Sequence, residues 1–244
     1  MCESLNQYCN RVKYLAYFGS FTRPEDYVPD ISDINVVAIS DDKSLLLEMA
    51  SEGCSPIVLT ENSLKDMCDK GDPICYYIMY DSRTVCGSLP AYIRFNFTQL
   101  TCERLRDSVI PLILNGIQSF FRYDELSTIN NLYRALRALI RWRSCEVQKS
   151  IPLSDKDVIK ACEGLSLSEI CEKFRDISRL RKLKITITEW DINEVTDSLS
   201  GELGEKIPNI FEIKSKVNGI VKSIVRLEKG KYIVNTADGK TIQL

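Results

Sequence analysis

Tyr14-Leu-Ala-Tyr-Phe-Gly-Ser-Phe-Thr-Arg-Pro24 and Asp33-Ile-Asn-Val-Val-Ala-Ile39 are the two stretches of sequence that decide the fold. Residues 14–18 form a compact aromatic and aliphatic run that ends at Gly19-Ser20, which predicts a strand. Residues 34–39 are rich in β-branched side chains and predict a second, buried strand. Polar residues therefore stand where the first strand ends and where the second begins.

The hydrophobic spacing changes along the chain and predicts an α+β protein built from several parts. Strand and helix patterns are mixed over about the first 90 residues, whereas apolar residues recur at helical spacing from about residue 100. The end of the chain carries three short strand patterns separated by hairpin-turn signals. We predict a mixed sheet with helices over residues 1–92, a helical bundle over residues 93–190, a linker over residues 191–209, and a small all-β meander or SH3-like unit over residues 210–244.

The composition excludes several classes of chemistry. The chain has no histidine, which removes Ser-His-Asp and Cys-His nucleophiles, histidine bases and histidine metal ligands. Its ten cysteines contain no Cys-x-x-Cys spacing, so the zinc-ribbon and redox signatures are absent. The N-terminus shows no secretory pattern, and we therefore expect a cytoplasmic protein with reduced, mostly buried thiols. Intracellular disulfides are the alternative.

The distribution of charge and apolar residues bears on the partners. The longest apolar runs, such as Val109–Leu114, are too short to cross a bilayer, so no membrane partner is expected. The net charge is −2, but residues 1–100 are acidic and residues 210–244 are basic. This asymmetry favours a cation or metal–nucleotide site in the first part and an anionic partner for the second. Two solvated surfaces of opposite charge are the alternative.

The two junctions have the residue types that a nucleotide and its metals require. Gly19 permits close approach of the backbone to a phosphate, and Ser20 adds a small hydroxyl. Residues at i and i+2 of a strand point to the same face, as Asp33 and Asn35 would. Two acids in that arrangement can hold two divalent metals, which activate an attacking oxygen and neutralise a triphosphate.

The chain resembles the polymerase-β-like nucleotidyltransferase superfamily, most closely its minimal branch, which often pairs with helical HEPN proteins. The resemblance covers residues 5–90 and is carried by Phe18-Gly19-Ser20, a gap of 12 residues, and Asp33-Ile-Asn-Val36. Gly19-Ser20-Phe-Thr-Arg23 also matches the branch's Gly-Ser-x-x-Arg, and Lys70-Gly-Asp-Pro73 is similar to a later segment. The family therefore implies the fold, an NTP as ligand and a helical protein as a partner.

The resemblance also implies roles for individual residues. Gly19 and Ser20 would hold the triphosphate, Arg23 would contact it, and Asp33 would ligate Mg²⁺. The reaction implied is transfer of a nucleoside monophosphate from an NTP to a nucleic-acid or protein acceptor.

Two positions depart from the family pattern. Asn35 stands where the family has its second catalytic acid, and no acid stands at Ser55-Pro56, where the third is expected. Glu52, Asp30 and Asp41 lie nearby in the sequence and could compensate. Three interpretations stay open: a metal-dependent transferase with Asp33 and Asn35 at its catalytic positions, a degenerate subunit that binds nucleotide, nucleic acid or protein, and an antitoxin-like partner of a helical RNase.

Basic and aromatic residues suggest a route for nucleic acid. Arg134, Arg137 and Arg141 lie along one predicted helix, where they could contact RNA or DNA phosphates, with Tyr133 and Trp142 available for stacking. A solvated helix face is the alternative. A second aromatic group, consisting of Tyr76, Tyr77 and Tyr80, could stack a base or simply pack against the core.

Overall fold

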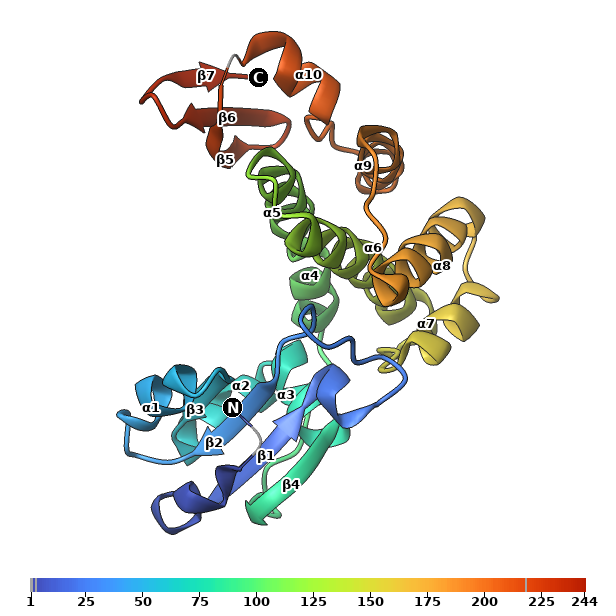
Figure 1. Cartoon of the computed structure of the whole chain (residues 1–244). Helices are drawn as coiled ribbons and strands as arrows, with labels where there is room; N and C mark the ends of the chain where they lie inside the picture. The colour runs from blue at the N-terminus through green and yellow to red at the C-terminus, as the bar shows by residue number, and fades with distance from the viewer. Residues whose placement is uncertain (1, 3, 218) are drawn as a thin grey trace. The chain divides into compact units, whose positions relative to one another are not determined.

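The computed structural model describes residue 2, residues 4–217 and residues 219–244, and it confirms the α+β class (Figure 1). The chain divides into two compact units. We call Met1–Arg104 with Pro152–Asp157 the sheet unit, and Leu105–Ile151 with Val158–Leu244 the helical unit. The predicted boundary at residue 92 is therefore too early, because the segment up to Arg104 folds with the sheet.

The sheet unit is built on a four-stranded sheet with the strand order β3-β2-β1-β4. Neighbouring strands β2 and β3 are parallel, whereas β1 is antiparallel to both β2 and β4. The elements, in chain order, are η1 (Leu5–Arg11), β1 (Tyr14–Phe18), η2 (Gly19–Thr22), β2 (Asn35–Ile39), α1 (Leu45–Ser51), β3 (Ser55–Leu59), α2 (Glu61–Asp69), α3 (Pro73–Tyr80), β4 (Ser82–Gly87) and α4 (Gln99–Asp107), of which η1 and η2 are 3-10 helices.

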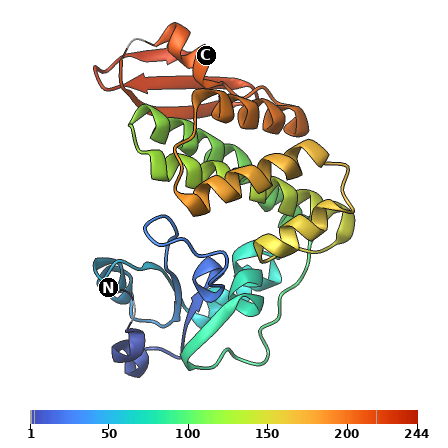
Figure 2. The same ribbon diagram turned by 45° about the vertical axis from the view of Figure 1, so that its right-hand side comes forward.

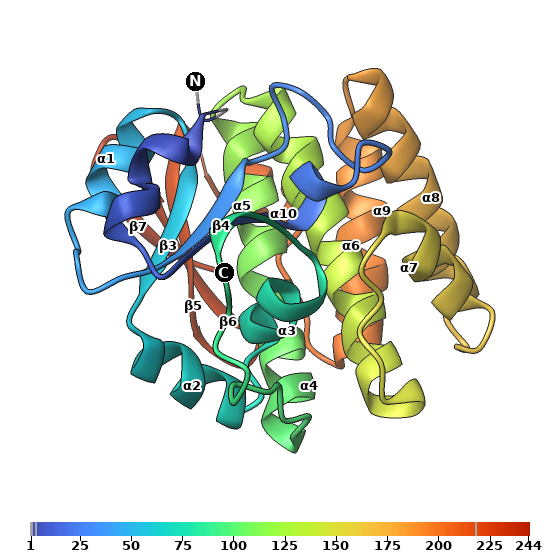
Figure 3. The ribbon, with the colours of Figure 1, turned by 90° about the horizontal axis from the view of Figure 1, so that it is seen from below.

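Helices cover both faces of this sheet, which explains why β1 and β2 are apolar almost throughout. On one face Leu15, Tyr17 and Val36 pack against η1 and α1. On the other face Phe18 and Val37 pack, with their strand neighbours, against α2 and α3 (Figure 3). All five residues of β1 are buried, so the predicted strand lies at the centre of the unit.

Gly87 is expected to be indispensable at the end of β4. It lies opposite Tyr14 with φ +74°, and a Cβ at this position would overlap the backbone carbonyl of Lys13. Gly87→Ala should therefore lower the free energy of unfolding by roughly 3 kcal/mol, measured by chemical denaturation. The matched control is Gly53→Ala, which has a similar φ of +86° and open space around the new methyl group. Equal losses for the two variants would show that the overlap has no effect.

The helical unit combines a bundle with a small antiparallel sheet of order β5-β6-β7. Figure 2 shows α8 and α9 packed beside α6. None of the helices in the described part of the chain has both the length and the apolar composition needed for a bilayer crossing. The elements are α5 (Val109–Phe121), α6 (Glu125–Gln148), α7 (Asp155–Cys162), α8 (Ser168–Leu183), α9 (Glu189–Leu203), α10 (Ile210–Lys216), β5 (Val221–Glu228), β6 (Lys231–Thr236) and β7 (Thr241–Gln243); α7 begins in the sheet unit.

The predicted linker over residues 191–209 is wrong, because most of this segment is helix α9. Thr188 starts the helix with a capping box, and Gly204 ends it in a left-handed conformation. Ile192, Val195 and Leu199 are buried at helical spacing. Polar residues between these positions dilute the apolar pattern, which is why the segment resembles a linker in sequence. The predicted three-stranded β-meander is confirmed, but the all-β range of 210–244 begins too early, because Ile210–Lys216 form helix α10 with Asn209 as its N-cap. The meander folds in the same compact unit as the bundle.

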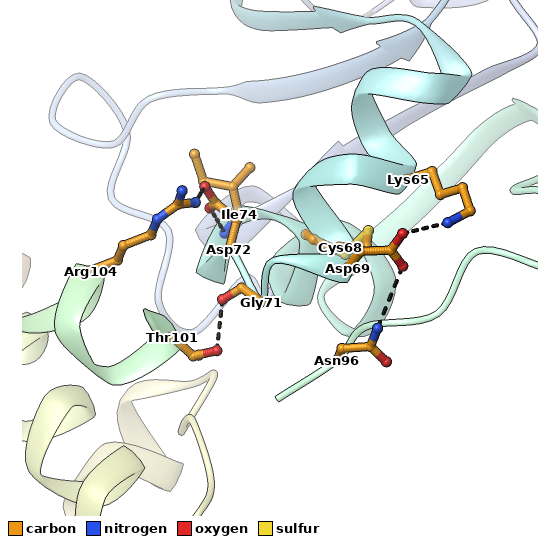
Figure 4. Close-up of a disulfide and its surroundings, with 10 residues drawn as sticks. Lys65, Cys68, Asp69, Gly71, Asp72, Ile74, Asn96, Thr101 and Arg104 are labelled. Atoms are coloured by element: carbon orange, nitrogen blue, oxygen red, sulfur yellow. Dashed lines mark hydrogen bonds and ion pairs between the residues drawn. A yellow bond between two sulfur atoms is a disulfide. The ribbon is translucent and has the colours of Figure 1, made fainter. Parts of the chain in front are cut away.

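The prediction of reduced thiols is also wrong, since no cysteine among residues 2, 4–217 and 219–244 is free. Disulfides within the sheet unit join Cys2 to Cys54, Cys9 to Cys86 and Cys68 to Cys75, and a disulfide within the helical unit joins Cys162 to Cys171. Their Cα–Cα distances are 5.1 to 6.1 Å. The Cys68–Cys75 bond joins α2 to α3 (Figure 4). Extensive pairing of this kind is typical of oxidising compartments and of hyperthermophiles rather than of an ordinary reducing cytoplasm.

Candidate site at the end of the sheet

One row of residues crosses the sheet where β1 ends and β2, β3 and β4 begin. Asn35 lies opposite Phe18 on one side and Ser55 on the other, and Phe18 in turn lies opposite Ser82. Residues in register point to the same face of a sheet. Asn35 and Ser55 therefore face the side of α2 and α3, as the buried Phe18 does.

The sequence-predicted residues Gly19 and Asn35 meet at this edge. Gly19 has φ +78°, its N–H donates to the Asp81 carbonyl at 3.0 Å, and a Cβ on it would lie 3.5 Å from the Asn35 amide nitrogen. Ser20 follows in η2 and is half-buried. Asp33 is exposed and precedes the strand by two residues. The edge thus combines the backbone at Gly19, which has no side chain, the Ser20 hydroxyl, the Asn35 amide and the exposed acid Asp33.

Arg23 is held between two buried carboxylates. Its Nε donates to Asp26 at 2.7 Å, and its Nη1 pairs with Asp81. The side chain of Arg23 is 13% exposed, while those of Asp26 and Asp81 are almost fully buried. Burial opposes the charge, but the two ion pairs outweigh it and raise the pKa of Arg23. A phosphate contact from Arg23 stays a prediction, and it would compete with both ion pairs.

A distant piece of the chain completes this network. The backbone N–H of Asp155 donates to the Asp26 carboxylate at 3.1 Å, which holds the short segment Pro152–Asp157 in the sheet unit. Within that segment Ser154 donates to Asp157 at 2.7 Å. Burial would raise the pKa of Asp157, but hydrogen bonds from Ser154 and the nearby backbone lower it. The sequence has no signal for the Asp26–Asp155 contact, because 129 residues separate the partners.

The residues at this edge do not fit a two-magnesium centre. Asn35 and Ser55 supply neutral oxygens at the positions where the family resemblance predicts carboxylates, and carboxylates are what two-metal catalysis requires. The buried acids Asp26 and Asp81 are engaged by Arg23. No group of three or more histidine, cysteine, aspartate or glutamate side chains in the described part of the chain could hold a metal ion.

The three arginines on α6 do not share one environment. Arg134 is exposed, Arg141 is half-buried, and Arg137 is buried and donates to the Tyr133 hydroxyl at 3.0 Å. The three positions occupy one side of the helix, as expected from their spacing. Their proposed contact with nucleic acid stays a prediction, but Arg137 already has a structural role inside the helical unit.

The expectation that Tyr133 and Trp142 could stack bases is wrong, because both rings are buried. Tyr133 stacks on Phe174 with centroids 5.6 Å apart, and Arg181 lies 4.4 Å from the Tyr133 ring. Trp142 lies 5.3 Å from both Arg106 and Arg143. Arginine–aromatic contacts of this kind stabilise the bundle and leave no face for a ligand.

An open groove of about 350 Å³ lies on the other side of the sheet unit, between η1 and α1. Its polar groups are already matched: Tyr8 donates to Glu52 at 2.8 Å, and Arg11 pairs with Glu48 at 2.6 Å and with Asp42 at 2.7 Å. Burial and the contact with Glu52 raise the pKa of Tyr8. The groove therefore lies on the face opposite Asn35 and is separate from the candidate site.

Comparison with known proteins adds no assignment, since neither the protein-family models nor the curated proteins contain a match to this chain. The nucleotidyltransferase resemblance stays a prediction from residues 5–90.

Proposed function

We propose that this chain is a nucleotidyltransferase-type subunit that binds a nucleotide without transferring it. The supporting observation is the row in which an amide (Asn35) and a hydroxyl (Ser55) are direct neighbours at the predicted positions of two catalytic acids. Two-metal catalysis depends on carboxylates that offset the charge of the ions. Neutral side chains cannot provide that charge, whereas Asp33 alone is compatible with the single Mg²⁺ that accompanies an NTP.

The same residues are suited to binding the phosphates of a nucleotide. An asparagine amide can donate a hydrogen bond to a phosphate oxygen, which an ionised aspartate cannot do. The Asn35 amide lies beside Gly19, whose lack of a side chain allows a phosphate to approach the backbone. An asparagine in place of an acid therefore has two effects. It removes a negative charge that would repel a phosphate, and it removes an anionic ligand for a metal ion.

Titration with ATP and Mg²⁺ tests this proposal. We expect saturable binding without incorporation of label from the nucleotide, and an affinity about tenfold lower for Asn35→Ala because a phosphate hydrogen bond is lost. Asn62→Ala, an exposed asparagine of the same unit, is the matched control and should bind as the wild type does. Mg²⁺-dependent incorporation that disappears in Asp33→Ala would instead establish the transferase interpretation.

A gain of metal binding is expected when the missing acids are restored. Asn35→Asp combined with Ser55→Asp places two carboxylates side by side on one face of the sheet, close to Asp33. This double variant should bind Mn²⁺ at least tenfold more tightly than the wild type, as measured by calorimetry or by the Mn²⁺ resonance signal. Unchanged Mn²⁺ affinity would mean that the Asn35–Ser55 row is not a former metal site.

A further inference from the structure

A chain of aromatic rings crosses the surface of the sheet unit. Tyr80 contacts Tyr76 with centroids 4.8 Å apart, Tyr76 contacts Phe95 at 5.2 Å, and Phe95 contacts Phe97 at 6.3 Å. Tyr76 and Tyr80 are one turn apart on α3, on the side opposite the buried Ile78. The Tyr76 and Tyr80 rings therefore point away from the sheet core, whereas Phe95 is partly buried and packs against that core.

Both ends of this ring chain are open to solvent. Tyr80 is 57% exposed and Phe97 is 39% exposed. Large aromatic side chains gathered on an exposed surface commonly mark a binding site. Tyr76 contacts Tyr80, and the core-packed Phe95 contacts Phe97, so each exposed ring has an aromatic neighbour that restricts its movement.

The segment that carries Phe97 has a positive charge. The segment Ser88–Thr98 holds Tyr92, Phe95 and Phe97 together with the exposed Arg94, and it contains no acid. The neighbouring acids of α2 and α3 are matched by cations: Asp69 pairs with Lys65, and Asp72 pairs with Arg104 (Figure 4). The surface thus combines stacking faces with one positive charge that no carboxylate of its own segment offsets.

The ring chain starts at the candidate site. Tyr80 immediately precedes Asp81, whose carbonyl accepts the Gly19 N–H at 3.0 Å. The next residue, Ser82, lies opposite Phe18 in the sheet. Tyr80 is therefore at the same end of the sheet as Gly19, and the rings continue from there toward Phe97.

We propose that Tyr80 and Phe97, with the exposed Arg94, form a platform for a single-stranded nucleic acid. Exposed aromatic rings stack on unpaired bases irrespective of the base sequence, while a cation contacts the phosphate backbone of the nucleic acid. A duplex is excluded as the ligand because its base faces are already stacked on one another. The proposal rests on the proposed nucleotide site in one respect only, namely that one end of the bound nucleic acid lies beside Gly19.

Fluorescence anisotropy with a labelled oligouridylate and a labelled oligothymidylate of about 20 nucleotides tests the platform. Tyr80→Ala and Phe97→Ala should each weaken binding about tenfold, because one stacked base is lost. Arg94→Gln should reduce the slope of log affinity against log salt by about 0.7, which corresponds to one phosphate contact. Tyr123→Ala is the control, since this ring is 88% exposed but belongs to the helical unit, and it should leave the affinity unchanged.

The possible results separate the two proposals. Absence of binding by the wild type, equal binding by wild type and Tyr80→Ala, or an equal loss in Tyr123→Ala would each overturn the platform. Asn35→Ala should lose nucleotide affinity and keep oligonucleotide affinity. Oligonucleotide binding that depends on Tyr80 and Phe97, in a protein that fails to bind ATP, would support the platform and refute only the nucleotide site.

Discussion

Replacing Cys9 and Cys86 by serine is expected to lower the free energy of unfolding by about 4 kcal/mol. The bond joins η1 to β4 across 77 residues of sequence, so removing it restores a large loop entropy to the unfolded chain. Both side chains are half-buried, and serine should fit without a large desolvation penalty. Guanidinium denaturation followed by circular dichroism measures the loss. The Cys68–Cys75 bond spans only seven residues and should contribute about 2.5 kcal/mol by the same reasoning.

A strong reductant provides the control for this experiment. Under reducing conditions the wild type and the Cys9→Ser, Cys86→Ser variant both lack the bond, and their stabilities should converge. If the oxidised variant stays within about 1 kcal/mol of the oxidised wild type, the bond does not stabilise the sheet unit by the loop-entropy mechanism.

Glu205→Ala is expected to destabilise the helical unit by about 3 kcal/mol. The buried Glu205 carboxylate accepts two hydrogen bonds from the Arg226 guanidinium, at 2.7 and 2.6 Å, one from the Gly230 N–H at 3.0 Å, and one from the Tyr232 hydroxyl at 2.9 Å. It thereby ties the end of α9 to the β5–β6 hairpin. Alanine would leave the buried Tyr232 hydroxyl without its acceptor. Denaturation and hydrogen exchange in β5 and β6 measure the effect.

The same contact predicts how stability depends on pH. Burial alone would raise the pKa of Glu205, but the bonds from Arg226, Gly230 and Tyr232 lower it below its usual value of 4.5. The contribution of Glu205 is therefore complete above about pH 5 and is lost as the pH falls through the lowered pKa. Glu205→Ala should remove this acid-dependent part of the stability. Glu202→Ala, an exposed acid on the same helix, should change stability by less than about 0.5 kcal/mol, and an equal effect of the two variants would contradict the assigned role.

Local sequence patterns predicted much of the sheet unit. The apolar run at residues 14–18 and the β-branched run at residues 34–39 became the two central strands, because a strand buried on both faces needs apolar side chains at nearly every position. Ser55, near which the family resemblance placed a third acid, lies in register with Asn35, a pairing that only the structure shows. The hairpins of the C-terminal sheet followed from turn residues, and Gly230 and Gly239 do adopt positive φ.

Other features depended on contacts between residues far apart in the sequence. The partners of the cysteines, the two carboxylates around Arg23 and the burial of Tyr133 have no local signature. Helix α9 does have a local signature, the helical spacing of Ile192, Val195 and Leu199, but the polar residues between these positions obscure it. A helical segment with so many polar residues becomes recognisable only once its buried side is known.

Sequence patterns were sufficient to place the strands of both sheets and the neutral residues at Asn35 and Ser55, because strands, turns and side-chain types are properties of short segments. Tertiary structure alone decided that Arg23 is held by Asp26 and Asp81, that the cysteines are paired, and that exposed rings extend from Tyr80 to Phe97. These facts depend on which distant segments pack together, and packing is governed by burial and hydrogen bonding across the whole chain rather than by local spacing.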